Sequence, residues 1–192
     1  MHKNITRANE RDIGDPPTPK NERRKRMCKK SWELYCMTYF DYLFTHPFTD
    51  DQRAWGNAIV SGIFEGGWRA EAAPRGDGKT TICKGVLTWA VNYGYLRFPV
   101  FFGANSTFAA AALSDIRLMY ERSDVLAEDF PEICYPVKCL EGAPQRAKMQ
   151  TSGGNRTLLQ WSGDEIIMPT TQGTLATGSA GAILACKGID SA

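Results

Sequence analysis

Histidine is scarce in this chain, since His2 and His46 are the only two among 192 residues. Catalysis by a Ser-His or Cys-His arrangement is therefore disfavoured. The six cysteines contain no CxxC pair, and together with the scarcity of histidine this argues against a zinc site and a disulfide framework. We expect reduced thiols, as is usual in a cytoplasmic protein.

Long apolar runs are also missing. No run of about 18 apolar residues occurs, so we expect no segment that spans a membrane. The polar start Met1–Asn4 lacks the apolar core of a secretion signal, which predicts a cytoplasmic location. With 43% hydrophobic residues, the chain is long enough for one sizeable α/β domain.

Positive charge is concentrated at the start of the chain. Residues 1–30 carry ten Lys/Arg and four Asp/Glu, a net charge of +6, whereas the remainder carries −4. Three prolines within residues 16–19 favour a flexible basic leader over residues 1–30, followed by a partial domain over residues 31–192. The basic run from Arg23 to Lys30 could follow a nucleic-acid backbone, touch an acidic partner or form the solvated start of a helix.

Residues 73–81 carry the clearest functional signal. Their sequence, Ala-Pro-Arg-Gly-Asp-Gly-Lys-Thr-Thr, matches the phosphate-binding loop template, in which glycine and four free positions precede Gly-Lys-Ser/Thr, except that Ala73 replaces the first glycine. Such a loop holds a polyphosphate through backbone N–H groups aimed at one point, which requires a tight turn. Gly76 and Gly78 permit that turn.

The loop residues have distinct expected roles. Lys79 would reach the β- and γ-phosphates of ATP as a mobile charge, and the hydroxyl of Thr80 would be a ligand of Mg²⁺. Asp77 and Thr81 belong to the same nucleotide-binding segment. Because the loop opens a helix, the free N–H groups and positive dipole end of that helix would add to the attraction for the anion.

The flanking patterns predict a strand, the loop and a helix in that order. Residues 68–72 alternate apolar and charged side chains, which is typical of a short strand. From Ile82 to Ala90 apolar residues recur at roughly helical spacing, until residues 92–94 end the run. The alternative is a glycine turn that precedes a lysine by chance.

Two helices are expected upstream of the loop. Residues 32–44 are rich in aromatic side chains and favour a helix packed on the core over a base-stacking surface. Thr49 is a plausible N-cap for a second helix that runs to Phe64. Gln52 has the position from which several nucleic-acid-driven ATPases read the adenine edge, although an exposed helical glutamine is the commoner explanation.

The downstream pattern completes the expected fold. Residues 98–103 predict a short strand buried in a parallel sheet, and Asn105 is expected to cap the helix that follows. Residues 157–161 and 166–168 flank a turn and predict a hairpin. These alternating elements predict a P-loop NTPase of the α/β class, with a doubly wound, mostly parallel sheet and flanking helices, incomplete within this chain.

One component of an ATPase is absent from the sequence. Apolar residues followed by Asp-Asp or Asp-Glu, the usual source of the carboxylate that organises Mg²⁺, do not occur after Lys79. Asp164-Glu165 precedes its apolar run instead of following a buried strand, so turn chemistry explains it better. We therefore expect the chain by itself to show little ATPase activity.

The order of these features resembles the N-terminal ATPase part of the large terminase subunit of tailed bacteriophages, the motor that pumps DNA into a procapsid. Pro74 to Thr80 reproduces a loop often found in that family, Pro-Arg-Gly-x-Gly-Lys-Ser/Thr. The aromatic stretch that ends at Pro47-Phe48, the segment Phe130-Pro131-Glu132 and the ending Lys187-Gly188 are also similar.

The resemblance implies a function and a set of partners. Lys79 and Thr80 would hold the phosphates and Mg²⁺, and Arg75 would sense or stabilise charge on the γ-phosphate. The full-length protein would couple ATP hydrolysis to translocation of double-stranded DNA, in a homo-oligomeric ring that meets a portal protein and a small terminase subunit. Its acidic strand would lie just beyond Ala192, with a nuclease domain farther on.

Two other interpretations stay open. Another P-loop enzyme, such as a helicase-like ATPase, would share the loop, whereas a small-molecule kinase would need an arginine-rich lid that is not evident after residue 156. A non-catalytic nucleic-acid-binding or protein-binding module would use the basic leader and would have no affinity for nucleotide.

Overall fold

The computed structural model describes residues 12–70, 72 and 74–191, and about half of the chain is helical. The helices are α2 (Glu22–Lys29), α3 (Trp32–Tyr39), α4 (Asp50–Glu65), α5 (Lys79–Asn92), α6 (Ser106–Arg122), α7 (Asp124–Asp129), α8 (Pro131–Lys138) and α9 (Gln172–Thr177), with the short 3-10 helices η1 (Pro144–Ala147) and η2 (Ile189–Ser191). The strands are β1 (Val100–Gly103), β2 (Thr151–Ser152), β3 (Asn155–Arg156), β4 (Glu165–Ile167) and β5 (Ile183–Gly188).

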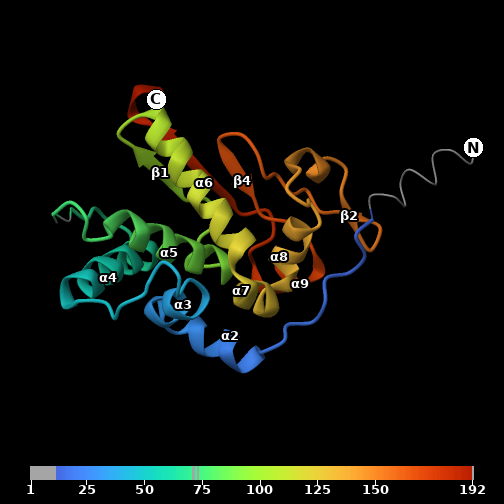
Figure 1. Cartoon of the computed structure of the whole chain (residues 1–192), viewed down its shortest axis with the longest axis horizontal. Coiled ribbons are helices and arrows are strands. Elements are labelled where there is room, and N and C mark those ends of the chain that lie inside the picture. The colour runs from blue at the N-terminus through green and yellow to red at the C-terminus, as the bar shows by residue number, and fades with distance from the viewer. Residues whose placement is uncertain (1–11, 71, 73, 192) are drawn as a thin grey trace, which may run out of the picture.

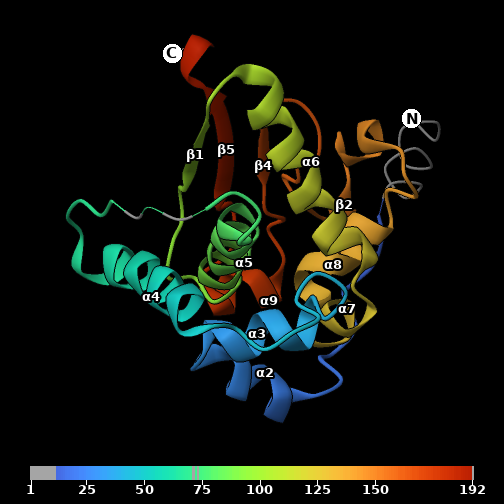
Figure 2. The same ribbon diagram turned by 60° about the vertical axis from the view of Figure 1, so that its left-hand side comes forward.

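The strands form two small sheets. In the larger one the order is β1-β5-β4, with β1 parallel to β5 and β4 antiparallel to it. The register pairs Val100 with Ala185 and Gly103 with Gly188. Figure 2 shows the three strands side by side, and α6 packs against them. The second sheet is the ribbon of β2 and β3.

The expected P-loop NTPase fold with a doubly wound, mostly parallel sheet is wrong. Within the described residues the parallel pairing is limited to β1 and β5, in a mixed sheet of three strands. The strand expected over residues 68–72 is not formed in its described part, and the side chain of Trp68 is 99% exposed. The physical reason is the composition of the face that would have to be buried, which consists of Trp68 and two alanines. Alanine has little strand preference and little apolar area to bury.

The strand expected over residues 98–103 is present as β1 and pairs in parallel, but it lies at the edge of the sheet. Phe102 is consequently 59% exposed instead of buried. The expected hairpin is reduced to one antiparallel bridge between Gln160 and Ile167, and β4 pairs with β5 along its length. Both differences arise because strand pairing depends on partners far away in the sequence.

Helix starts follow local chemistry and agree with the sequence. The hydroxyl of Thr49 accepts a hydrogen bond from Gln52 N, and the side chain of Gln52 accepts one from Thr49 N, which is a complete capping box for α4. The side chain of Asn105 accepts from Phe108 N at the start of α6. These predictions are confirmed, as is the helix after residue 78.

The core lies where α3 meets α5 and α6. Tyr35 of α3 is fully buried, and its ring makes edge contacts with Tyr39, Phe40, Tyr93 and Phe130 at centroid distances of 5.0–6.4 Å. The prediction that the aromatic stretch packs on the core is therefore confirmed.

The described part of the expected leader, residues 12–30, lies along the body of the molecule (Figure 1). The carboxylate of Asp12 accepts hydrogen bonds from Gly153 N and Gly154 N at 3.1 and 2.8 Å. Farther on, Lys20 forms an ion pair with Glu128. The body thus contacts this segment at its first described residue and again at Lys20.

All six cysteines are free thiols, as expected from their spacing. Burial raises the pKa of Cys83 and Cys186 to about 11, so both thiols are weak nucleophiles near neutral pH. None of the helices described between residues 12 and 191 has both the length and the apolar character needed to cross a membrane.

Candidate functional site

Two glycines with left-handed or similar backbone angles precede α5. Gly78 is the N-cap of α5 and adopts φ 79° and ψ 11°, in the left-handed region, and Gly76 has φ 95°. A residue with a side chain would be strained at either position. Among the described residues, no side chain makes a capping hydrogen bond at the N-terminus of α5. The first N–H groups of a helix point out of its N-terminus, where an anion can accept from them.

Lys79 is the first residue of α5, and its side chain bends back over the loop. Lys79 Nζ donates a hydrogen bond to the carbonyl oxygen of Pro74 at 3.0 Å, on the exposed side of the loop. The ammonium group therefore lies on the segment that precedes the two glycines. An anion at the helix N-terminus would offer Lys79 a charged partner in place of this neutral carbonyl.

Gln52 connects the loop to α4. Its amide oxygen accepts from Thr49 N at 3.0 Å, and Gln52 Nε2 donates to the carbonyl oxygen of Asp77 at 3.0 Å. The same glutamine therefore fixes the start of α4 and one side of the loop. A primary amide has two donor hydrogens, so this contact with Asp77 uses half of the donor capacity of Gln52.

A hollow of about 190 Å³ lies beside the loop. Its walls include Phe44 and Phe48, whose ring centroids are 5.2 Å apart, and it also touches Gln52, Gly78 and Thr81. Apolar walls next to one amide edge suit a flat ring with polar groups on its rim, which is the shape of a nucleobase.

The structure assembles most of the predicted site residues. Gly76 to Thr81 form one turn of loop and helix with Gln52 against it, and residues 77–81 are partly buried. Arg75 is exposed. Ala73 lies outside the described residues.

Sequence reasoning missed the aromatic wall made by Phe44 and Phe48. The signal that could have found it is the capping box of Thr49 and Gln52, because a capping box fixes the direction in which the preceding chain enters its helix. Because Gln52 is a predicted site residue, the residues just before Thr49 were candidates for side chains that lie next to Gln52.

The described residues contain no group of three or more His, Cys, Asp or Glu side chains that could hold a metal ion. Mg²⁺ that is bound with a nucleotide usually takes phosphate oxygens, waters and one or two protein oxygens as ligands. The hydroxyl of Thr80, in the first turn of α5, is a candidate for such a protein oxygen.

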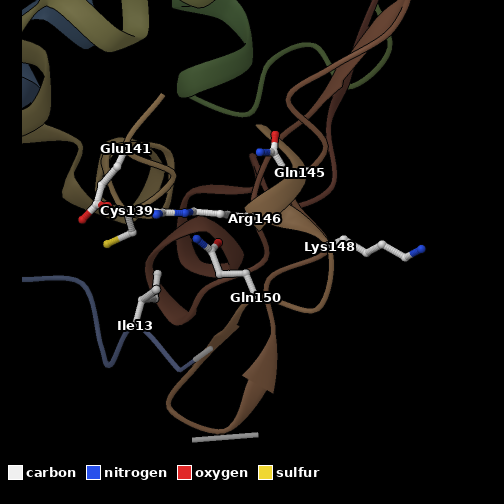
Figure 3. Close-up of a pocket in the computed structure, with 7 residues that line it drawn as sticks. All are labelled: Ile13, Cys139, Glu141, Gln145, Arg146, Lys148 and Gln150. Carbon is white, nitrogen blue, oxygen red and sulfur yellow. Dashed lines mark hydrogen bonds and ion pairs between the residues drawn. The ribbon is translucent and has the colours of Figure 1, made fainter. Parts of the chain in front are cut away.

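A larger hollow of about 620 Å³ lies between residues 139–150 and Ile13 (Figure 3). Its polar groups do not converge. Arg146 forms an ion pair with Glu141, the amide of Gln150 donates to the carbonyl oxygen of Pro136, and Lys148 points outward. Size alone therefore does not make it the better candidate site.

Comparison of the chain with protein-family models, with curated proteins and with solved structures gave no match. The resemblance to the terminase large subunit accordingly stays a prediction from the sequence.

Proposed function

We propose that residues 74–81 bind the polyphosphate of ATP together with Mg²⁺. The observation that supports this best is the left-handed Gly78 immediately before an α5 N-terminus that no side chain caps, with Lys79 as the first helical residue. A site of this kind needs a glycine-permitted turn and a helix end, so it does not depend on an extended parallel sheet.

In this proposal each neighbour has one task. The N–H groups at the start of α5 hold phosphate oxygens, Lys79 leaves the carbonyl of Pro74 for the β- and γ-phosphates, and Thr80 supplies an oxygen to Mg²⁺. The base lies between the ring of Phe48 and the amide of Gln52, in the hollow beside the loop.

The wider role that fits this site and the sequence resemblance is the ATP-binding part of a phage DNA-packaging motor, the terminase large subunit. The full protein would act in the cytoplasm of an infected cell, as a homo-oligomeric ring with double-stranded DNA, a portal protein and a small subunit as partners. Arg75 is exposed, and in this proposal it would meet the γ-phosphate or a neighbouring subunit.

A titration with a fluorescent ATP analogue in the presence of Mg²⁺ tests the site. We expect Lys79→Ala to weaken binding by about tenfold or more, equivalent to about 1.4 kcal/mol, because the charged phosphate contact is lost. Lys138→Ala is the control, since it removes a lysine charge from α8, outside the proposed site. Equal affinity of wild type and Lys79→Ala would contradict the assignment.

A further inference from the structure

The outer surface of α2 is strongly basic. Helix α2 contains five lysine and arginine residues, and Lys30 at its C-cap is a sixth. Two of the six form ion pairs inside the molecule. Arg24 pairs with Asp129 at 2.6 Å, and Lys25 pairs with Glu132 at 2.7 Å in a largely buried position. The other four are exposed to solvent: Arg23, Arg26, Lys29 and Lys30.

These four residues lie on one side of the helix. At 100° per residue, residues 23, 26, 29 and 30 fall within an arc of about 120°, and they extend over about 10 Å of helix length. The opposite side, with Lys25 and Cys28, is buried. We call the exposed arc of Arg23, Arg26, Lys29 and Lys30 the α2 basic face.

The acidic groups around α2 are mostly engaged with other cations. Glu128 and Asp129 pair with Arg24, and Glu33 of α3 pairs with Arg53 at 3.2 Å. Glu22 is the acidic residue within α2 itself. In the part of the chain that the structure describes, Arg23, Arg26 and Lys30 take part in no ion pair. The face therefore carries four positive charges against one negative charge.

We propose that the α2 basic face binds the phosphate backbone of nucleic acid. A row of cations over about 10 Å can contact several phosphates of a duplex, which follow one another about every 3.4 Å along each strand. An acidic protein partner fits less well, because protein interfaces centre on large apolar or aromatic anchors and the four residues of the α2 basic face supply none. Among the described residues of α2, the exposed large apolar side chain is Met27.

The location of this face is separate from the proposed nucleotide site. In Figures 1 and 2, α2 and α3 lie at the bottom of the molecule, opposite the C-terminus. The segment that leads into α5 runs above α4 in both views. Binding of nucleic acid here requires no ATP, so this inference stands or falls independently of the proposed ATP site.

Fluorescence anisotropy with a labelled DNA duplex of about 30 base pairs, over about 50–200 mM NaCl, tests the inference. We expect the triple variant Arg23→Gln, Arg26→Gln, Lys30→Gln to bind at least about tenfold more weakly at the lowest salt. The slope of log affinity against log salt should fall by about 2–3, since each lost phosphate contact contributes about 0.9. All three side chains are exposed, and circular dichroism checks that the fold is retained.

The matched control is Lys148→Gln, Arg156→Gln, Lys187→Gln, which changes the net charge equally at exposed positions elsewhere. It should bind the duplex within about twofold of wild type. Unchanged binding by the α2 triple variant, or an equal loss in both triple variants, would overturn the inference. Displacement of the duplex by polyglutamate at equal charge concentration would also overturn it, in favour of an acidic protein partner.

Discussion

Single glycines of α4 determine how closely its neighbours can approach. A Cβ atom added at Gly56 would lie 2.1 Å from the ring of Trp32, whose Nε1 donates a hydrogen bond to Asn57 at 2.9 Å. At Gly62, six residues farther along the same helix, an added Cβ atom would meet nothing within 4 Å. Replacement of glycine by alanine should therefore change the free energy of unfolding in opposite directions at the two positions.

We expect Gly56→Ala to lower the free energy of unfolding by about 1–3 kcal/mol, because Trp32 must move out of a packed position. Gly62→Ala should raise it by about 0.5–1 kcal/mol through the better helix propensity of alanine. Urea unfolding followed by circular dichroism measures both. Two changes of the same sign would show that the contact between α3 and α4 is not as described.

Substitution of Gly78 tests whether this glycine has a part in ATP binding in addition to its effect on backbone strain. Gly78→Ala should lower the free energy of unfolding by about 1–2 kcal/mol, because the φ of this residue is 79°. It should also weaken ATP binding, because the turn before α5 changes. Gly142→Ala, at φ 73° with open space around it, carries the same strain elsewhere. It should reduce stability similarly and leave the affinity for ATP unchanged. Comparable loss of affinity in both variants would mean that Gly78 has no specific part in binding.

At the scale of elements, one polar network joins α3, α5 and α6. Asn92 Nδ2 donates to the hydroxyl of Tyr35, and the hydroxyl of Tyr120 donates to Asn92 Oδ1, both at 2.7 Å. All three side chains are buried, and burial raises the pKa of both tyrosines well above its ordinary value. Satisfied buried groups of this kind fix how the helices pack.

We expect Asn92→Ala to destabilise the fold by about 2–4 kcal/mol, because it removes the hydrogen bonds that Asn92 makes with the buried hydroxyl groups of Tyr35 and Tyr120. Tyr120→Phe removes one hydroxyl and should cost less, since it leaves one acceptor unsatisfied. Chemical unfolding gives both values. A cost for Asn92→Ala no larger than that for Tyr120→Phe would indicate that water replaces the missing amide.

The attachment of residues 12–30 should depend on pH. Hydrogen bonds from Lys20 and Arg24 hold the pKa of Glu128 below its ordinary value of 4.5. This contribution is present above that pH and is lost as the pH falls through the lowered pKa of the folded state. Wild type should therefore lose more of its thermal stability than Glu128→Gln on acidification from about pH 6 to about pH 3. Identical pH profiles would show that this pair does not stabilise the fold.

Across the whole molecule, the sequence predicted what local chemistry determines. The caps at Thr49 and Asn105 and the turn at Gly78 depend on residues a few positions apart, so their patterns are visible in the chain. The sheet was mispredicted because β1 pairs with β5, more than eighty residues away, and the pattern at residues 68–72 carries no information about a partner.

In the candidate site, too, the features set by neighbouring residues were predicted and those set by distant residues were not. The glycine turn and helix start at Gly76 to Thr80, where we propose that phosphate binds, are local and were predicted. The hollow beside Phe44 and Phe48 depends on tertiary contacts. The ion pairs of Arg24 and Lys25 inside the molecule could not be predicted either, because their acidic partners lie about a hundred residues later in the chain. The sequence shows the charges, and the fold decides which of them remain exposed.

The most direct test of the account is an amide-resolved NMR titration of the chain with ATP and Mg²⁺. The proposed site predicts the largest shifts at Gly76, Gly78, Lys79 and Thr80, with smaller shifts at the side-chain amide of Gln52. Shifts centred on residues 139–150, or no shifts at millimolar nucleotide, would contradict the claim that the glycine turn before α5 binds ATP.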